Sequence, residues 1–244
     1  MSEREAELAA NLRQVRARIE AAARSAGRDP AELTLIAVTK TYPASDVALL
    51  AELGVRDVGE NRDQEAAAKH AAVSSLGLRW HFIGQLQRRK CRSVVTYADV
   101  VHSVDRPELA VALGAAADAA GRTLDALVQV SLDEPGSAGR GGVAPAAVMA
   151  LAEQVASTPG LRLAGLMAVA PHPGHQDRVH QDRVDPGAPY RRLADLSEEV
   201  RAEFPAATML SAGMSGDLEA AVENGATHLR VGTALLGRRA PVVG

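Results

Sequence analysis

Eight short apolar segments alternate with alanine-rich helical sequence along this chain of 244 residues, and this alternation most limits its possible folds. Several segments are continuously apolar, as expected for parallel strands that are buried on both faces. The alternation predicts an α/β fold, a single (β/α)8 barrel of the TIM type that spans residues 1–244, with a doubly wound sheet as the alternative. The expected strands are residues 33–39, 55–58, 80–83, 99–103, 125–131, 161–169, 207–211 and 227–231.

An additional helix is expected before the first strand. Between residues 4 and 26, apolar residues recur at helical spacing among charges, and Gly27 follows as a stop signal. No other long exposed apolar seam is evident, so we expect a monomer. The formal net charge of -3 and the 2% of aromatic residues argue against a nucleic-acid partner. Residues 1–7 are charged where a signal peptide is apolar, and no segment could span a membrane, so we expect a cytoplasmic protein without membrane contact.

Polar residues follow the expected strands, at the rim where the active groups of a barrel lie. Lys40 follows the first strand, Asn61 the second, and two glycine-containing segments, residues 211–215 and 232–233, follow the seventh and eighth. Separate parts of the chain should therefore converge on one rim. We interpret His102, on an apolar strand end, as a hydrogen-bonded core histidine rather than a catalytic base.

Lys40 and the two glycine-containing segments have complementary chemistry. A lysine at the mouth of a buried strand is expected to be partly desolvated, which favours the neutral amine that a Schiff base to an aldehyde requires. Hydroxyl and backbone N–H groups after strands seven and eight suit a phosphate dianion. An aldehyde and a phosphate together predict pyridoxal 5'-phosphate (PLP) as the cofactor. The alternative is a solvated lysine beside ordinary tight turns.

Arg230 lies near the end of the eighth expected strand, where its guanidinium could point into the barrel mouth. There it would donate to the pyridine nitrogen and keep that nitrogen unprotonated, which makes the ring a weak electron sink. This favours a protein that holds the cofactor over a vigorous enzyme. The alternative is an ion pair with a rim carboxylate such as Glu60.

A direct repeat follows the sixth expected strand: His175-Gln176-Asp177-Arg178-Val179 recurs as residues 180–184. Histidine and aspartate could bind a metal, but the repeat has five-residue spacing and no rigid scaffold. We therefore interpret it as a solvated loop and predict no metal site.

The motifs together resemble those of the pyridoxal phosphate homeostasis proteins. The likeness extends from about residue 8 to Gly237 and implies the barrel of the alanine-racemase N-terminal domain. Its motifs, in chain order, are Ala37-Val38-Thr39-Lys40-Thr41, Gly59-Glu60-Asn61-Arg62-Asp63-Gln64-Glu65, Trp80-His81-Phe82-Ile83-Gly84-Gln85-Leu86-Gln87, His102-Ser103-Val104-Asp105, Gly165-Leu166-Met167, Leu210-Ser211-Ala212-Gly213-Met214-Ser215 and Arg230-Val231-Gly232-Thr233-Ala234.

The resemblance implies a role for each candidate residue. Lys40 would form the internal aldimine with PLP, Arg230 would face the pyridine nitrogen, and Asn61 would lie beside the ring. The remaining cofactor contacts, mostly to the phosphate, would come from Ser211, Met214, Ser215, Gly232 and Thr233.

Racemases of the alanine type need a second base on the opposite face of the cofactor, a tyrosine from a separate β-domain. The tyrosines here are Tyr42, Tyr97 and Tyr190, and Tyr42 would share the strand end of Lys40. We therefore expect a reversible carrier that buffers PLP and passes it to apoenzymes by transient contact, without robust catalysis. The alternatives are a small PLP-dependent racemase or lyase that uses water or Tyr42 as second base, and a barrel that binds another phosphorylated metabolite noncovalently.

Overall fold

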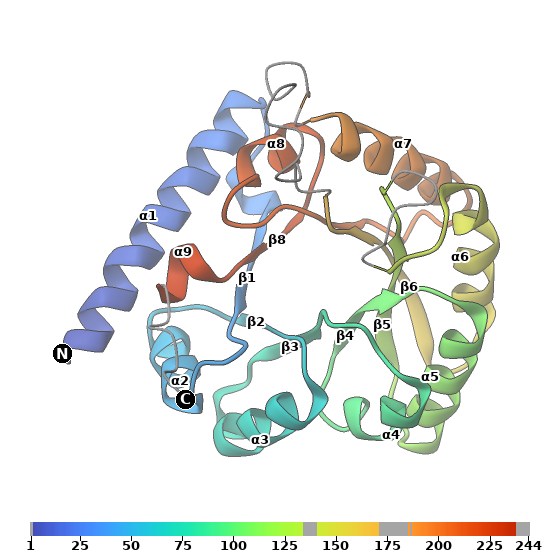
Figure 1. Ribbon diagram of the computed structural model, residues 1–244, viewed down its shortest axis with the longest axis horizontal. Helices are drawn as coiled ribbons and strands as arrows, with labels where there is room; N and C mark the ends of the chain where they lie inside the picture. Colours follow the sequence, from blue (N-terminus) through green and yellow to red (C-terminus); the bar gives the residue numbers. More distant parts are fainter. Residues whose placement is uncertain (1, 134–140, 171–184, 186, 238–244) are drawn as a thin grey trace.

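The computed structural model describes residues 2–133, 141–170, 185 and 187–237, and in it eight parallel strands form a closed barrel (Figure 1). Each strand pairs with the next one in sequence, and β8 pairs with β1. This closure confirms the predicted barrel and excludes the doubly wound sheet, which would leave two open edges. The strands are β1 (Thr34–Val38), β2 (Asp57–Glu60), β3 (Arg79–Phe82), β4 (Val100–Val104), β5 (Leu124–Val130), β6 (Leu161–Ala168), β7 (Met209–Ser211) and β8 (His228–Val231).

Helices surround the strands, as the alternating sequence predicts. Each expected strand overlaps an observed one, and the boundaries differ by at most two residues. The helices are α1 (Glu3–Ser25), α2 (Ala44–Glu52), α3 (Asp63–Val73), α4 (Cys91–Val94), α5 (Pro107–Ala119), α6 (Val148–Ser157), α7 (Ala188–Glu203), α8 (Leu218–Glu223) and α9 (Thr233–Leu236), with short 3-10 turns η1 (Pro30–Glu32), η2 (Ser74–Leu76), η3 (Arg88–Lys90) and η4 (Pro145–Ala147).

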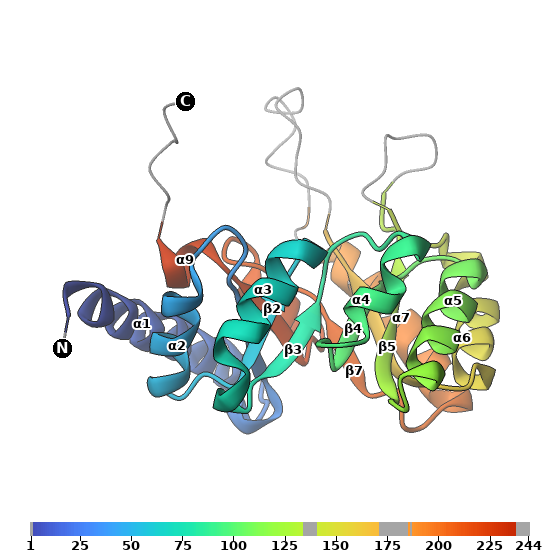
Figure 2. The same ribbon diagram turned by 90° about the horizontal axis from the view of Figure 1, so that it is seen from below.

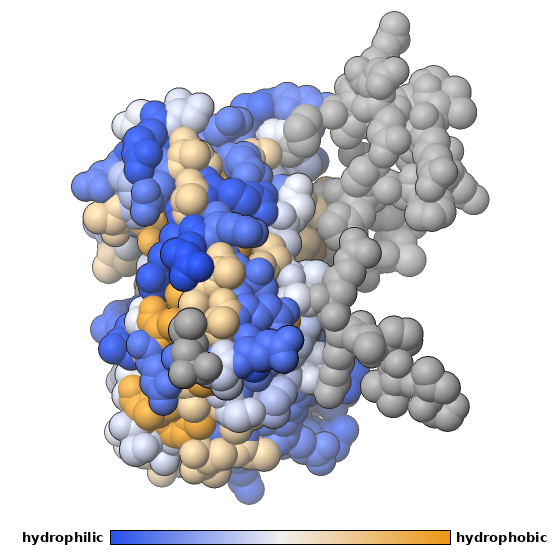
Figure 3. Space-filling view, turned by 90° about the vertical axis from the view of Figure 1, so that its left-hand side faces the viewer, coloured by the Kyte–Doolittle hydropathy of each residue, from blue (hydrophilic) through white to orange (hydrophobic). Residues whose placement is uncertain are grey.

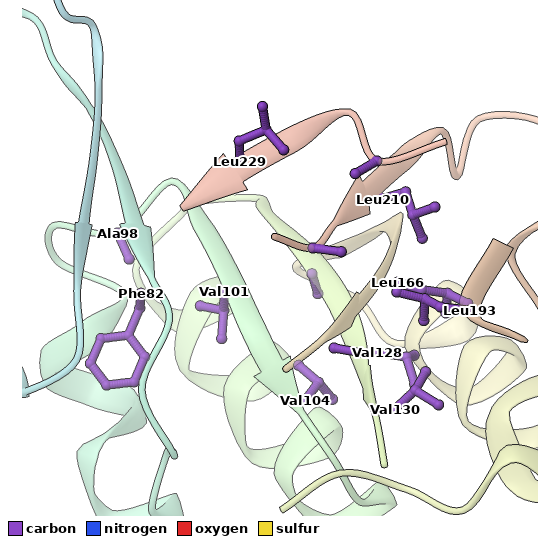
Figure 4. Packing of buried hydrophobic residues seen from close by; sticks show 14 of the residues in the cluster. Phe82, Ala98, Val101, Val104, Val128, Val130, Leu166, Leu193, Leu210 and Leu229 are labelled. Carbon is purple, nitrogen blue, oxygen red and sulfur yellow. The ribbon is translucent and has the colours of Figure 1, made fainter. Parts of the chain in front are cut away.

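Most of the hydrophobic core lies between the strands and the helices. Figure 4 shows part of it, with Leu166 of β6 near Leu193 of α7. Inside the barrel a smaller apolar cluster is formed by Val100, Leu127, Ala164 and Met167. The strands are therefore covered on both faces, which explains why their sequences are continuously apolar.

The predicted N-terminal helix is confirmed as α1, which packs against α8 and α9 beside the barrel (Figure 2). Ser2 and Glu5 form a capping box at its start. Its apolar stripe, Leu8, Leu12, Val15 and Ile19, is buried against the barrel. The outer surface on this side mixes hydrophilic residues with intermediate and hydrophobic ones (Figure 3). Among the helices that the structure describes, none has the length and hydropathy needed to cross a membrane.

Candidate functional site

The candidate residues lie at the C-terminal rim of four adjacent strands, β7, β8, β1 and β2. The register Ala37↔Val231 places Val38 beside Gly232. A Cβ atom on Gly232 would lie 3.4 Å from both the Cβ and the carbonyl oxygen of Val38. The strand that leads to Lys40 therefore packs directly against the segment expected to bind phosphate.

Lys40 lies two residues beyond β1, in a tight turn, and the structure corrects one expectation about it. Lys40 is exposed, so the expected partial desolvation of its amine is wrong. The reason is geometric, since Thr39 continues the buried strand whereas the turn carries Lys40 past the packed rim. The following residue, Thr41, has a left-handed backbone with φ 69°, which is uncommon for a residue with a branched side chain.

A buried ion cluster holds this turn from the outer side of β1. Lys69 of α3 donates to the carbonyl of Thr39 at 2.6 Å and to the carboxylates of Glu60 and Glu65, each at 2.7 Å. Glu60 also accepts from the Thr39 hydroxyl at 2.7 Å, and Glu65 accepts from the backbone N–H of Thr41. Burial raises the pKa of Glu60, although its bonds to Lys69 and Thr39 act in the opposite direction. We did not anticipate this cluster from the sequence, where the i,i+4 pair Glu65–Lys69 is its one visible sign.

The segments after β7 and β8 meet, as predicted. The backbone N–H of Ala234 donates to Ser215 Oγ at 3.3 Å, which joins the two segments. Asp217 accepts from the backbone N–H of Met214 at 2.6 Å and fixes the turn between Gly213 and Ser215. Gly213 has φ 83°, and a Cβ there would lie 2.6 Å from Ala221, so the turn requires glycine.

Helix α1 supports the same turn from outside. Arg18 donates to the carbonyl of Ser215 at 3.2 Å and forms a two-pronged ion pair with Glu219 at 2.9 and 3.0 Å. Asn11 donates to the carbonyl of Leu235 at 3.0 Å, at the end of α9. The N-terminal helix thus braces both segments of the candidate phosphate site, a role that its amphipathic pattern alone did not reveal.

Arg230 lies inside the barrel, buried, at the end of β8. Its Nη1 donates to Ser211 Oγ at 2.6 Å and its Nη2 to the carbonyl of Ala168 at 2.8 Å. No carboxylate among the described residues forms an ion pair with it, and burial lowers the pKa of its guanidinium to about 10. The alternative pairing with Glu60 is wrong, because Glu60 points to the opposite side of the β-sheet, toward Lys69 of α3.

Ser211 is fully buried between Arg230 and His102. His102 Nδ1 lies 2.9 Å from Ser211 Oγ, and its Nε2 lies 2.9 Å from His81 Nδ1. His81 Nε2 in turn lies 2.9 Å from Asp57 Oδ1. Burial lowers the pKa of His81 and lowers that of His102 well below its ordinary value. The interpretation of His102 as a hydrogen-bonded core histidine is confirmed, and a contact between Ser211 and a phosphate stays a prediction.

Asn61 follows β2, one strand away from Lys40. Its Oδ1 atom is buried and has no hydrogen-bond partner among the described residues. The backbone of Asn61 passes so close to Gly84 that a Cβ there would lie 2.2 Å from the Asn61 carbonyl oxygen. Only glycine fits at Gly84, and this close contact fixes Asn61 in place.

The three tyrosines are engaged elsewhere. The Tyr42 hydroxyl donates to the carbonyl of Gly237 at 2.7 Å. Tyr190 donates to Asp217 at 2.5 Å and Tyr97 to Asp63 at 3.4 Å, and both rings are buried. Burial, as the largest cause, raises the pKa of both Tyr97 and Tyr190.

No group of three or more metal-ligating side chains occurs in the part of the chain that the structure describes. The repeat at residues 175–184 lies outside the described residues.

Comparisons with known proteins place these features in context. The family model "Alanine racemase, N-terminal domain" matches residues 6–240. The pyridoxal phosphate homeostasis protein of Mycobacterium tuberculosis is 44% identical over an alignment of 256 positions that covers 97% of this chain and 95% of the relative. The crystal structure of an unknown protein from Bifidobacterium adolescentis is similar, with a TM-score of 0.86, 30% identity and coverage of 96% of this chain and 97% of that one. PipY of Synechococcus elongatus, solved with PLP bound, has a TM-score of 0.78, 34% identity and coverage of 94% and 100%.

Proposed function

Because this chain belongs to the family of the alanine racemase N-terminal domain, we propose that it binds PLP reversibly through Lys40 and acts in PLP homeostasis. Its similarity over nearly the full length to proteins named for that role, and to PipY with PLP bound, supports the proposal. In this proposal the protein buffers a reactive aldehyde and passes it to apoenzymes, and its effect on amino-acid metabolism is indirect.

The observation that carries the proposal is the buried guanidinium of Arg230, whose two hydrogen-bond acceptors among the described residues, Ser211 Oγ and the Ala168 carbonyl, are both neutral. A buried charge without a counter-charge is costly. A ligand that combines a basic ring nitrogen with an anionic group would compensate it. Arg230 would face the pyridine nitrogen, with Asn61 and its unpartnered Oδ1 beside the ring.

The phosphate would lie between the segments after β7 and β8. Ser215, Gly232 and Thr233 would bind it, with Met214 beside it in the same turn and Ser211 below. The bond between the Ala234 N–H and Ser215 Oγ joins the two segments and supports a ligand shared between them. This position is the standard phosphate site of (β/α)8 barrels.

Lys40 would hold the cofactor covalently. When bound, PLP supplies an aldehyde carbon that a primary amine attacks, so that a C=N bond forms and water leaves. Exposure makes the amine of Lys40 accessible, and the buried ion cluster under Thr39 fixes the turn that presents it. An accessible linkage suits a carrier that must also release its cargo.

The tyrosines favour a carrier over a racemase. All three hydroxyls donate to other groups, and that of Tyr42, the tyrosine nearest to Lys40 in sequence, is held by the carbonyl of Gly237. These bonds support the expectation that no tyrosine supplies a second base on the opposite face of the cofactor. We accordingly propose a protein without robust catalytic activity.

The proposal includes a setting for this role. A carrier serves the apoenzymes where they are made, so we propose a cytoplasmic location and transient contacts with PLP-dependent apoenzymes. Among the described residues, the large exposed apolar side chains are Leu76 and Val111, which are too few for a stable subunit interface, so we propose a monomer.

The decisive experiment is borohydride reduction of the PLP-treated protein, followed by peptide mass mapping. The label is expected on Lys40, and Lys40→Ala should abolish both the label and the PLP absorbance band. Lys90→Ala is the matched control, because Lys90 is partly exposed and lies on another part of the rim, paired with Asp63. Label on another lysine, or no label, would reject the covalent assignment.

The two alternatives are separated by simple assays. Incubation of the PLP-loaded protein with single L-amino acids, followed by chiral analysis, should give no turnover at rates typical of enzymes. Sustained racemisation would reject the carrier function in favour of a racemase. Binding of another phosphorylated metabolite without any change in PLP absorbance would instead favour a noncovalent site.

A further inference from the structure

A continuous series of hydrogen bonds crosses the barrel interior from the C-terminal rim, where the cofactor is proposed to bind, to the N-terminal end of the strands, here called the base. It begins at Arg230, passes through Ser211, His102 and His81, and ends at Asp57, the first residue of β2. The successive distances are 2.6, 2.9, 2.9 and 2.9 Å. We call these five residues the interior chain. Five different strand segments contribute to it, so that it exists only in the closed barrel.

With both imidazoles neutral, the carboxylate at Asp57 fixes the direction of every bond in the interior chain. A guanidinium can only donate, and a carboxylate can only accept. Arg230 therefore donates to Ser211, and the Ser211 hydroxyl donates to His102 Nδ1. His102 Nε2–H then donates to His81 Nδ1, and His81 Nε2–H donates to Asp57. In this arrangement each neutral imidazole carries its proton on Nε2.

The surroundings of the two rings agree with this assignment. Both histidines are buried, and desolvation lowers the pKa of each. The neighbouring cations Arg79 and Arg230 and the ring of His228, whose centroid lies 6.4 Å from that of His81, disfavour a further positive charge. Asp57 is the opposing carboxylate at hydrogen-bond distance, and Asp99 and Asp125 are the other acidic groups at the base of the barrel.

The direction of the chain determines how Arg230 is held. Because the Ser211 proton is given to His102, a lone pair of Ser211 Oγ faces the guanidinium. With the carbonyl of Ala168, this gives Arg230 two fixed acceptors on two different nitrogens. If His102 Nδ1 carried the proton instead, Ser211 Oγ would have to accept from both His102 and Arg230, and the hydroxyl would lose the one arrangement that fixes a lone pair on the guanidinium. The orientation of Arg230 therefore depends on a carboxylate at the far end of the barrel.

We propose that Asp57 is a positioning residue for the cofactor ring and acts on Arg230 through His81, His102 and Ser211. The inference rests on the proposed function, because that function supplies the ligand. The direction of the hydrogen bonds in the interior chain does not depend on it. No contact between Asp57 and PLP is involved. The acceptor at Asp57 determines the tautomers of His81 and His102. These tautomers determine the direction of the Ser211 hydroxyl, which in turn determines the orientation of the Arg230 guanidinium that would face the ring.

The first test needs no cofactor. In wild-type protein labelled with ¹⁵N-histidine, NMR at neutral pH should show His81 and His102 as neutral rings protonated on Nε2, because protonated and bare ring nitrogens resonate far apart. A proton on Nδ1 of either ring, or a charged ring, would overturn the proposal.

The second test breaks the chain at its base. Asp57→Leu removes the acceptor, so the His81 and His102 spectra should both change, and the dissociation constant for PLP should rise roughly threefold to tenfold. Asp57→Asn keeps a carbonyl acceptor without the charge and should restore the wild-type tautomers and most of the affinity. It also keeps the test decisive if Asp57→Leu does not fold.

The matched control is Asp125→Asn, which removes a carboxylate at the same end of the barrel, paired with Arg79 and Arg162 rather than with the chain. It should leave both histidine spectra and the PLP affinity unchanged. A loss of PLP affinity in Asp125→Asn as large as that in Asp57→Leu would mean that only the charge at the base matters, and would overturn the proposal. If wild-type protein failed to bind PLP while its histidine tautomers were as predicted, the proposed function would be rejected, whereas the assigned direction of the interior chain would be retained.

Discussion

The barrel interior has two sides that are filled by different means. On one side Val100, Leu127, Ala164 and Met167 fill space with apolar volume. On the other side the five residues of the interior chain fill it with polar groups that satisfy one another. An apolar side tolerates any side chain of suitable size, whereas a polar chain tolerates only the set that completes every bond. The apolar side therefore supplies stability and the polar side supplies a defined geometry at the cofactor rim.

Acid should break the polar side selectively, with the largest effect on stability. Burial lowers the pKa of His228 to about 4 from an ordinary value of 6.5, and the pKa values of His81 and His102 are also lowered. Below about pH 6.5 these histidines bind protons in the unfolded chain but not in the folded one. The free energy of unfolding is therefore highest above pH 6.5 and decreases as the pH falls toward 4. Each such histidine contributes about 1.4 kcal/mol per pH unit.

Denaturant titration from pH 7 to pH 4.5 measures this slope. His228→Asn should reduce it by the contribution of one titrating group. An identical slope in the variant would show that His228 is not one of the groups responsible.

Truncation on the apolar side should come next in size. Leu127→Ala leaves a cavity in the interior and is expected to lower the free energy of unfolding by about 2–5 kcal/mol. Because Leu127 makes no bond to the interior chain, the PLP dissociation constant of the folded variant should not change. A marked loss of affinity at full folding would show that the two sides are not independent.

Ser211→Ala should give a smaller loss of stability together with a loss of affinity. It leaves His102 Nδ1 without its donor and Arg230 Nη1 without its acceptor, for which we expect about 1–3 kcal/mol. Ser197→Ala, at a buried serine of α7 outside the chain, is the control. The contrast between the two sides would be lost if Ser211→Ala and Leu127→Ala had the same ratio of stability loss to affinity loss.

The smallest effect is expected at Arg18 of α1, which supports the candidate phosphate site from the surface. Arg18→Ala removes a partly exposed ion pair, so its effect on stability should stay within about 1 kcal/mol. It also releases the carbonyl of Ser215, and PLP affinity should fall about twofold. Arg24→Ala removes a comparable pair on the same helix, with Glu20, and should leave PLP affinity unchanged. Calorimetry and absorbance titration of both variants provide the comparison.

The sequence predicted the barrel because each strand is buried on both faces and so has its own apolar signal. Lys40, Ser215 and Arg230 were predicted because polar residues at strand ends stand out against those segments. The interior chain was not predicted. Asp57, His81 and His102 become neighbours only when strand order, inward direction and register are known together. The exposure of Lys40 was also missed, since it depends on how far the turn carries it beyond Thr39.

Helix α1 and the segments it braces lie at opposite ends of the chain. Arg18 and Asn11 are made first, yet their partners at Ser215 and Leu235 are among the last described residues. The ribosome therefore releases the helix long before the segments that it supports exist, and β1 must likewise wait for β8. The phosphate site proposed at this rim can therefore form only after residues 228–237 have been synthesised, long after α1 and β1.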